Sequence, residues 1–527
     1  MSEVLISDKI SETALEVFKK NNVSVDYKPG IEHSDLINII SKYQGLAIRS
    51  ATKVTSDLLE KASNLKVIGR AGIGTDNIDK TLATQKGIIV MNTPFGNAVT
   101  TAEHTIAMIM SLVRFIPLAD QSTRQGKWEK SKFNGIEVTN KTLGLIGCGN
   151  IGSIVAARAI GLKMKVIAYD PFLNSKKAEE IGVEKVDLDK ILNKSDIISL
   201  HTPLTEETKN IISADAINKM KKGVRIVNCA RGGLVDEHAC RAGLDSGHIA
   251  GAAFDVFTEE PAINNILFDA PNFIATPHLG ASTKEAQENV AIQIAEQISD
   301  YLKSGAVINA LNYPNLSSED ARTLKPYLNL SYLLGSFLGQ VTVDEIREIK
   351  LELEGKASSL NTEPILANLI AGVLEQTSES VNAVNSREVA LNRGINFSTT
   401  KHERRCDYET LLTITLKHQF GTRSISGTLI GGYMPRIVNI QGIPIESDFP
   451  AHALYLRNYD KPGFIGDLGN TLGKKGVNIA SFHLGRRERG GEAIALIETD
   501  EEISDGILKD VKNLPQVLRV NSVNFKK

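Results

Sequence analysis

The sequence predicts an α/β protein with two doubly wound parallel sheets, followed by a smaller α+β segment and a terminal βαββαβ unit. Short apolar runs alternate with helical patterns from residue 4 to about residue 310, which is typical of parallel sheets covered by helices. A polar segment containing Pro314 follows at residues 312–320 and predicts a linker. After residue 450 the predicted order becomes strand, helix, two strands, helix, strand.

Length and composition narrow the class of protein. The 527 residues predict about three domains on the usual scale of ~150 residues each. The formal net charge of −2 at pH 7 offers no basic field, so neither a nucleic-acid nor a membrane partner is expected. The four cysteines form no CxxC pair, and the N-terminus lacks a basic-then-apolar signal pattern. We therefore expect a cytoplasmic protein without disulfides or a metal site.

The first 95 residues contain five short apolar runs, which predict the strands of the first sheet at residues 4–6, 23–25, 46–48, 65–68 and 88–90. Two of these runs end in an arginine that is followed by turn residues. Ligands of open α/β sheets bind beyond the carboxyl ends of the strands, where guanidinium groups and glycine-rich backbone can hold an anion. The predicted anion site consists of Arg49, Ser50, Arg70, Gly72 and Gly74. The alternative is that both arginines are solvated or ion-paired.

A long buried helix is predicted next, from residue 100 to residue 119, with Thr100 and Thr101 as candidate N-caps. The segment 126–133 then places the only tryptophan, Trp128, among cations. This composition favours either an interface arm or a solvated turn.

Residues 143–170 predict a strand, a glycine turn, a helix and a second strand. Gly147 permits the tight turn, Gly149 lets the backbone approach a pyrophosphate, and Gly152 lets the helix pack on its strand. The helix N-terminus presents free amides to phosphates, and Asp170 suits the free 2′-hydroxyl of NAD better than the phosphate of NADP. A glycine-rich structural turn is the alternative, because a GxGxxG match alone is weak evidence.

Later strands carry three chemically complementary side chains beyond their carboxyl ends: Arg231, Glu260 and His278. Because an imidazole titrates near working pH, His278 can accept the proton of a hydroxyl as hydride leaves the carbon. Glu260 can orient that imidazole and favour its protonated form, and Arg231 offers a planar fork to a 2-hydroxy or 2-oxo carboxylate. Taken singly, each has an ordinary alternative: His278 as a packed histidine, Glu260 as a surface acid and Arg231 as part of an ion pair at the end of the sheet. Together, beside a dinucleotide fold, they predict a hydride-transfer site.

Three motifs carry a family resemblance: NCARGGLVDE at 228–237, GAAFDVFTEEP at 251–261 and TPHLGASTKEA at 276–286. They resemble the D-isomer-specific 2-hydroxyacid dehydrogenases. The resemblance implies an NAD-dependent dehydrogenase in which the arginine, glutamate and histidine above are catalytic. It also implies NAD contacts from the glycine turn and the later strand ends, namely Gly147, Gly149, Asn150, Ile151, Gly152, Asp170, Thr202, Cys229, Ala230, Asp255, Gly280 and Ala281.

The same resemblance implies that the first lobe is discontinuous. A helix near residues 285–310 would return to complete it, so that the flavodoxin-like substrate-binding domain comprises residues 1–97 and 285–312. The Rossmann-like NAD-binding domain would then comprise residues 98–284. The cleft between the two lobes is expected to close by hinges where the chain crosses between them.

Within this family, the motifs VLISDKI, LAIRSATKVT, GRAGIGTDNID and GKWEKSKF most resemble the long-form branch that oxidises 3-phosphoglycerate to 3-phosphohydroxypyruvate, the first step of the phosphorylated serine pathway. This implies that Arg49 and Arg70 meet the substrate phosphate and carboxylate, with Lys130 reaching in from a dimer partner. Relatives commonly have arginine at the position of Lys130, so this contact departs from the pattern.

Residues 318–448 mix helical and strand-like patterns and contain no catalytic constellation. They resemble the intervening, anion-responsive domain of the long-form branch, and their ligand stays open. Residues 451–527 predict a ferredoxin-like unit, and their motif NYDKPGFIGDLGNTLGKKGVNIASFHLGR resembles an ACT domain, a regulatory fold that binds amino acids between paired modules. The alternative is a unit used only for oligomerisation.

Three residues of this last unit, Asn458, Asp460 and Asn478, lie at positions that resemble a serine-binding pattern. Asp460 suits an α-ammonium group, and Asn478 suits a carboxylate or hydroxyl. A larger polar or aromatic residue is often found at the position of Asn458, which is a second departure. L-serine is therefore the expected effector.

These features together predict a serine-regulated, NAD-dependent homo-oligomer, expected to be a tetramer. One alternative is a glyoxylate or hydroxypyruvate reductase, which the pair of Arg49 and Arg70 and the ACT-like tail disfavour. The other is an NAD-sensing corepressor-like binding protein, which the compact amino-acid-binding module at the C-terminus disfavours.

Overall fold

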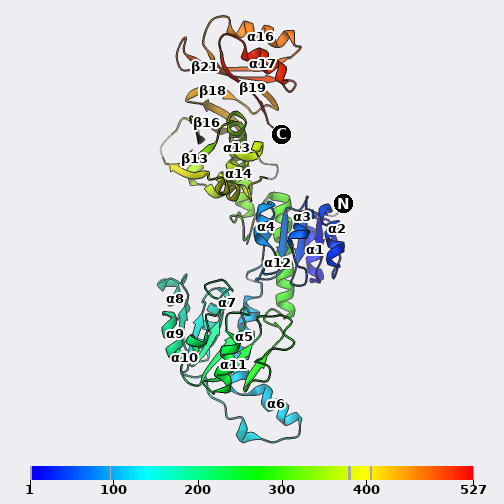
Figure 1. Ribbon diagram of the computed structural model, residues 1–527, viewed down its shortest axis with the longest axis vertical. Helices are drawn as coiled ribbons and strands as arrows, with labels where there is room; N and C mark the ends of the chain where they lie inside the picture. The colour runs from blue at the N-terminus through cyan, green and yellow to red at the C-terminus, as the bar shows by residue number, and fades with distance from the viewer. Residues whose placement is uncertain (1–2, 95, 378–380, 404–405, 526–527) are drawn as a thin grey trace.

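The computed structural model describes residues 3–94, 96–377, 381–403 and 406–525. They form four sheets that follow one another along an elongated molecule (Figure 1). The two parallel sheets are built from the N-terminal half of the chain, and the mixed and antiparallel sheets from the C-terminal half. The predicted fold class is confirmed.

The first sheet has the order β2-β1-β3-β4-β5, and all neighbouring strands are parallel. Its strands are β1 (Val4–Ile6), β2 (Val25–Tyr27), β3 (Gly45–Ile48), β4 (Val67–Arg70) and β5 (Ile89–Met91). The helical segments between them are α1 (Glu12–Lys20), α2 (His33–Ile39), η1 (Ile40–Lys42), α3 (Ser56–Lys61) and α4 (Lys80–Gln85). All five predicted strands exist, two of them shifted by two residues because pairing begins only at Val25 and continues to Arg70.

The long helix α12 (Lys284–Ser304) packs on this first sheet although it follows the second sheet in the sequence. Gly69 of β4 makes the close approach possible. A Cβ atom at Gly69 would lie 2.6 Å from the side chains of Ile294 and Ile298, so any larger residue would push the helix away. In Figure 1, α12 spans the region between the two parallel lobes.

The second sheet has the order β12-β11-β10-β9-β6-β7-β8 and is also parallel throughout. Its strands are β6 (Thr142–Ile146), β7 (Lys165–Tyr169), β8 (Glu184–Lys185), β9 (Ile197–Leu200), β10 (Val224–Asn228), β11 (Ile249–Phe254) and β12 (Phe273–Ala275). The connecting helices are α7 (Asn150–Gly161), α8 (Ser175–Ile181), α9 (Leu188–Lys194), α10 (Ala214–Lys219) and α11 (Glu237–Asp245). The strand order reverses at β6, and such a switch point opens a ligand-binding crevice at the carboxyl edge of the sheet.

The single helix predicted at residues 100–119 was wrong. The structure has two helices, α5 (Ala98–Val113) and α6 (Ile116–Arg124), with a 62° bend between them. Phe115 takes a left-handed conformation at the break, and a proline follows at the start of α6, where its missing N–H cannot continue the α5 hydrogen-bond ladder. Thr100 and Thr101 lie inside α5 rather than at its N-cap.

A membrane-spanning helix needs about 20 predominantly apolar residues. Within the described part of the chain no single helix is long and apolar enough, and only the bent pair of α5 and α6 together reaches that length and hydropathy. Half of the α5 residues are buried in the core of the second lobe.

The third sheet is mixed, with the order β14-β13-β15-β16-β17-β18. Its strands are β13 (Ile346–Gly355), β14 (Asn396–His402), β15 (Thr410–His418), β16 (Gly421–Ile430), β17 (Met434–Ile440) and β18 (Ile443–Ser447). The helical segments are α13 (Ser318–Val341), η3 (Lys356–Ser359), α14 (Thr362–Leu374), η4 (Glu375–Thr377) and α15 (Ser386–Asn392). The predicted linker was too long at its C-terminal end, since α13 already starts at Ser318, capped by the Ser317 hydroxyl.

The fourth sheet is antiparallel, with the order β20-β21-β19-β22. Its strands are β19 (His452–Tyr459), β20 (Ile479–Arg486), β21 (Glu492–Thr499) and β22 (Val517–Asn524), and its helices are α16 (Phe464–Lys474) and α17 (Asp505–Lys512). This is the predicted ferredoxin-like order of elements.

One hydrophobic core is continuous across three of the four units. Buried residues of β1, α12, α13, β13 and β19 belong to the same connected cluster. Phe337 of α13 packs edge-on against Tyr455 of β19, with ring centroids 5.2 Å apart. The helix α13 therefore links the core of the first lobe to the C-terminal sheets.

Candidate functional site

The glycine turn after β6 has the geometry that a bound dinucleotide requires. Gly147 has a φ of 92°, and a Cβ atom there would lie 2.5 Å from the carbonyl oxygen of His201. A Cβ atom at Gly152 would lie 2.4 Å from the Gly147 carbonyl oxygen, whereas one at Gly149 would meet nothing within 4 Å. Gly149 caps α7 without a side-chain hydrogen bond, so the first amides of α7 and the open space before them fit a pyrophosphate.

Asp170 follows β7 and lies beside this turn. Its carboxylate accepts hydrogen bonds from the backbone N–H groups of Cys148 and Phe172, both at 2.8 Å. A carboxylate has about four acceptor positions, so the two bonds fix Asp170 and leave acceptor capacity for ribose hydroxyls.

Cys229 and Ala230 follow β10 at the same edge of the sheet. Burial and the nearby Asp255 carboxylate raise the pKa of the Cys229 thiol to about 12, so the side chain is an inert part of the core. The Ala230 backbone N–H is held by the side chain of Asn228 at 3.1 Å. Cys229 and Ala230 are both predicted cofactor contacts. Because its thiol is buried in the core, Cys229 can contact a cofactor only through its backbone. Thr202 follows β9 beside Gly147.

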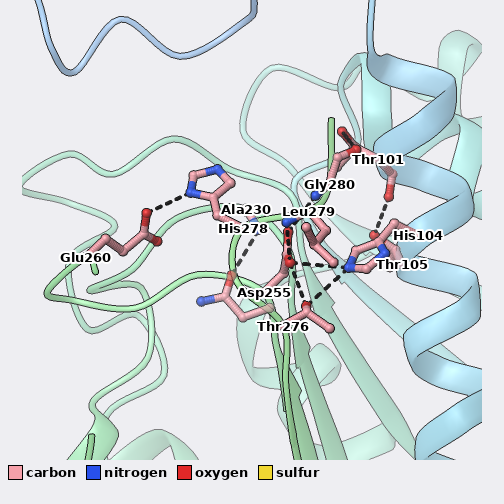
Figure 2. Close-up of polar contacts among 11 residues, drawn as sticks. Thr101, His104, Thr105, Ala230, Asp255, Glu260, Thr276, His278, Leu279 and Gly280 are labelled. Carbon is pink, nitrogen blue, oxygen red and sulfur yellow. Dashed lines mark hydrogen bonds and ion pairs between the residues drawn. The ribbon is translucent and has the colours of Figure 1, made fainter. Parts of the chain in front are cut away.

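Asp255 follows β11 and organises the loop that carries His278 (Figure 2). Its buried carboxylate accepts hydrogen bonds from the N–H groups of Leu279 at 2.7 Å and Gly280 at 2.8 Å, and from the hydroxyl of Thr276. His104 of α5 lies 3.3 Å away. Burial alone would raise the pKa of Asp255, but its hydrogen bonds, led by the one from His104, lower it. Asp255 was predicted to contact the cofactor. In the structure its carboxylate is occupied by hydrogen bonds to other residues of the protein.

Gly280 and Ala281 end this loop. The Gly280 carbonyl oxygen accepts a hydrogen bond of 2.9 Å from the hydroxyl of Thr101 on α5, which ties the loop to the helix that starts at the crossing between lobes. Gly280 is buried and Ala281 is partly exposed.

His278 and Glu260 form a direct pair. The His278 Nδ1 atom lies 2.7 Å from Glu260 Oε2, and Figure 2 shows the glutamate reaching toward the imidazole from a separate loop. Burial would raise the pKa of Glu260, but the hydrogen bonds from His278 and from the Phe257 N–H lower it. The backbone of His278 is left-handed, with φ of 55°, and its N–H donates to the Asp255 carbonyl oxygen. The imidazole is thus fixed with Nε2 facing away from Glu260.

Arg231 connects the two lobes. Its Nε atom lies 3.1 Å from Asp76 Oδ2 in the loop after β4, and its Nη1 donates to the Ala230 carbonyl oxygen at 2.6 Å. A Cβ atom at Gly74 would lie 1.9 Å from Arg231 Nη2. The predicted substrate glycine and the predicted catalytic arginine are therefore in contact across the cleft.

Arg70 lies in the same region, at the end of β4. A Cβ atom at Gly72, whose φ is 143°, would lie 2.0 Å from Arg70 Nη1. Burial, together with the charge of Arg231, lowers the pKa of Arg70 to about 10. Its Nε is buried without a hydrogen-bond partner. A buried cation with an unused donor is a suitable binding group for an anion.

Two other predicted substrate residues are only partly placed. Arg49 donates from its side chain to the Lys9 carbonyl oxygen and from its backbone to the Asp8 carboxylate, and the exposed Ser50 follows it. Lys130 begins η2 (Lys130–Lys132). It follows α6, which projects from the lobe of the second sheet on the side remote from the first sheet (Figure 1). Within one chain, Lys130 therefore does not join the arginines.

The predicted effector residues do not converge within one ACT unit. Asp460 binds Arg486, and its N–H donates to the Gly491 carbonyl oxygen, just before β21. Asn478 binds Asp500, just after β21, at 2.7 Å. Nine residues of extended chain span roughly 30 Å, so these two side chains lie at opposite ends of the sheet. Asn458 is buried in β19 with an unpartnered Oδ1.

Two residues of the site were missed from the sequence. Asp76 stands in the motif GRAGIGTDNID, but its contact with Arg231 joins residues far apart in the chain. His104 lies on α5, and its partner Asp255 becomes visible only once α5 is packed on the second sheet. A histidine and an acid inside apolar patterns are the available signals, and neither identifies its partner.

Three family models match successive parts of the chain. The model of the D-isomer specific 2-hydroxyacid dehydrogenase NAD binding domain matches residues 106–280. The D-3-phosphoglycerate dehydrogenase intervening domain matches residues 323–441, and the ACT domain matches residues 452–516.

Full-length relatives decide the family. The D-3-phosphoglycerate dehydrogenase of Bacillus subtilis is 41% identical over 537 aligned residues, which cover 100% of both chains. The chain belongs to the D-3-phosphoglycerate dehydrogenase family. The D-3-phosphoglycerate dehydrogenase of Synechocystis is also 41% identical, over 97% of this chain and 92% of that one.

A solved structure shows which part is shared more widely. The D-lactate dehydrogenase from Aquifex aeolicus, complexed with NAD and lactic acid, is 28% identical with a TM-score of 0.53. It aligns over 100% of its own length but only 59% of this chain. This member of the D-3-phosphoglycerate dehydrogenase family is thus an oxidoreductase with an NAD-binding domain, extended by an intervening and an ACT domain.

Proposed function

We propose that the chain catalyses the NAD-dependent oxidation of 3-phospho-D-glycerate to 3-phosphohydroxypyruvate, the first step of the phosphorylated route to serine. One observation supports the proposal: Arg231, which follows β10 in the second lobe, lies against Gly74 of the first lobe and near the buried Arg70. In the proposed site, the pair of His278 and Glu260 supplies the acid–base chemistry and the two arginines bind the anionic groups. Such a site suits a substrate with a hydroxyl group and two anionic groups.

His278 is the proposed general base. Because Glu260 engages Nδ1, Nε2 is the atom that takes the proton from the C2 hydroxyl, and the ionised Glu260 stabilises the imidazolium that results. Bound NAD supplies the oxidising chemistry by accepting the hydride from C2. In the reverse direction His278 returns the proton to the carbonyl oxygen.

Arg231 is proposed to bind the substrate carboxylate and to polarise the C2 carbonyl, with Arg70 and Arg49 holding the remaining anionic charge. Burial and repulsion by Arg231 lower the pKa of Arg70, and the attraction of a bound anion would offset both effects. Gly72 and Gly74 keep the backbone clear of the two guanidinium groups.

Cofactor residues are proposed on the same grounds. The amides at Gly149, Asn150 and Ile151 would hold the pyrophosphate, and Asp170 would hold the ribose hydroxyls of NAD. The strand-end residues Thr202, Cys229, Ala230, Gly280 and Ala281 would line the nicotinamide side through their backbone.

Regulation by L-serine is proposed at the ACT unit, between two chains. Since Asp460 and Asn478 occupy opposite ends of one sheet, a site using both needs two units side by side in reversed orientation. This supports a homo-oligomer, proposed to be a tetramer, in which Lys130 of one chain reaches a partner's substrate site. The four free cysteines support a cytoplasmic location.

A substrate panel tests the proposed function. The purified chain is assayed with NAD at alkaline pH and a keto-trapping agent, using 3-phosphoglycerate, D-glycerate and D-lactate, each with and without L-serine. We expect kcat/KM for 3-phosphoglycerate to exceed that for D-glycerate at least 100-fold, because the arginines recognise the phosphate. Reduction of NAD with D-glycerate but not with 3-phosphoglycerate would contradict the proposal.

A further inference from the structure

Asp76 lies at the cleft but has no part in the proposed chemistry. It stands two residues after Gly74, in the loop between β4 and α4 of the first lobe. Its carboxylate binds the Nε atom of Arg231, which belongs to the NAD-binding lobe, at 3.1 Å. The Asp76 side chain is 74% exposed, whereas that of Arg231 is 29% exposed. The ion pair therefore crosses between the lobes at the mouth of the site.

The donors of Arg231 show what this contact does. Nε is engaged by Asp76, and one Nη1 hydrogen is engaged by the Ala230 carbonyl oxygen. Nη2 lies over Gly74, where a Cβ atom would be 1.9 Å away. A guanidinium group has five N–H donors in a fixed plane. With two donors engaged from the protein, the plane is fixed and the Nη1–Nη2 end stays free for a carboxylate.

Charge around the loop supports the same role. Arg70 lies near both other arginines: burial and the charges of Arg231 and Arg49 lower its pKa, while the charges of Asp76 and Asp8 oppose this shift. Asp8 is engaged with the backbone N–H groups of Arg49 and Thr52. Asp76 is therefore the carboxylate that binds Arg231 from the opposite lobe.

We propose that Asp76 positions Arg231 for the reaction, by holding the Nε edge of its guanidinium so that the opposite edge meets the substrate carboxylate. Asp76 touches neither substrate nor cofactor in this arrangement. An exposed ion pair contributes little to stability, so its effect belongs in the kinetics of the substrate and not in folding or in NAD binding. The inference rests on the proposed function for the identity of that carboxylate.

Three variants test the role: Asp76→Ala removes the contact, Asp76→Asn keeps an oxygen acceptor without the charge, and Glu60→Ala is the control. Glu60 is an exposed acid on α3 of the same lobe. Each full-length variant is assayed for kcat and KM with 3-phosphoglycerate, D-glycerate and D-lactate, and for the Kd of NADH by fluorescence. A fourth variant, Gly74→Ala, displaces Arg231 Nη2 by its added methyl group without changing charge.

The expected pattern is specific. Asp76→Ala lowers kcat/KM about 10- to 100-fold, Asp76→Asn recovers most of it, Gly74→Ala resembles Asp76→Ala, and Glu60→Ala stays within twofold of the wild type. The Kd of NADH stays within twofold throughout.

The inference would be overturned if kcat/KM were unchanged in Asp76→Ala, or if it increased, which would make Asp76 a competitor of the substrate for Arg231. Equal losses of kcat/KM in Asp76→Ala and Asp76→Asn, or a parallel loss of NADH binding, would also overturn it. If the wild type oxidises D-glycerate or D-lactate but not 3-phosphoglycerate, the proposed function fails, while the role of Asp76 is still decided on the acid that reacts. If no acid is oxidised, both fail.

Discussion

The second and fourth sheets gather their strand-end residues in opposite ways. In the parallel NAD-binding sheet, the residues that follow β6, β7, β10 and β11 all emerge at one edge, so the glycine turn, Asp170, Arg231 and Asp255 become neighbours. In the antiparallel ACT sheet, consecutive strand ends alternate between two edges, and Asp460 is separated from Asn478 by the length of β21. Parallel topology builds a site within one chain, whereas antiparallel topology supplies two half-sites.

The largest expected effect tests the claim that the parallel edge is complete in itself. His278→Ala removes the proposed base and should lower kcat about 10³-fold, within the range of general base catalysis, with NADH affinity retained. Because Arg231 and His278 belong to one lobe, chains carrying Arg231→Ala co-assembled with chains carrying His278→Ala should stay inactive. Recovered activity in these hybrids would contradict the claim that the parallel sheet builds a complete site within one chain. Normal turnover by His278→Ala would contradict the role of His278 as the base.

A smaller effect concerns pH and the same edge. His201 follows β9, and burial lowers its pKa to about 4 from the ordinary value of 6.5. Between these pH values the unfolded chain binds more protons than the folded chain, so stability is complete above pH 6.5 and is lost as the pH falls toward 4, by on the order of 3 kcal/mol.

The measurement is hydrogen exchange of peptides from β6 and β9 at pH 7 and pH 5, corrected for the intrinsic exchange rate. We expect their protection free energy to fall at pH 5 in the wild type and to fall less in His201→Asn. Peptides from β21 serve as the internal reference, since His452 and His483 of the ACT unit are partly exposed. An equal fall in both proteins would rule out His201 as the cause.

The smallest expected effect tests the two half-sites. Asp460→Ala and Asn478→Ala should each abolish serine inhibition while leaving uninhibited activity unchanged. In a mixed pair that contains one chain of each variant, one of the two sites combines an intact Asp460 with an intact Asn478, so about half of the inhibition should return in purified mixed assemblies. Hybrids with no inhibition would place the effector site within one chain, and loss of basal activity would indicate a structural role.

The parallel sheets were predictable because their strands contain uninterrupted apolar runs, such as those of β1 and β3, buried on both faces. The edge strands β14 and β18 have no such run, because β14 is largely polar and half-exposed and β18 alternates buried and exposed residues. The break at Phe115 was missed because a left-handed phenylalanine has no sequence signal.

The residues of the candidate site also fall into two groups, those that the sequence could place and those that it could not. Residues that follow strands of one sheet could be placed together from topology alone, as with Glu260 and His278, which form a hydrogen-bonded pair. The pairing of Asp76 with Arg231 depends on how two separate lobes approach each other, and the opposite placement of Asp460 and Asn478 depends on strand direction. Local sequence patterns predict neither the pairing of Asp76 with Arg231 nor the separation of Asp460 from Asn478.

The continuous core around α13 also bears on how such a chain can gain or lose its C-terminal half. Family models divide the chain into units, yet Leu324 and Phe337 of α13 belong to one apolar cluster with the first sheet and with Tyr455. A cut at the linker would leave a water-exposed apolar seam on both pieces. If relatives exchange the C-terminal half during evolution, α13 and the surface of the first lobe on which it packs would therefore have to be inherited together.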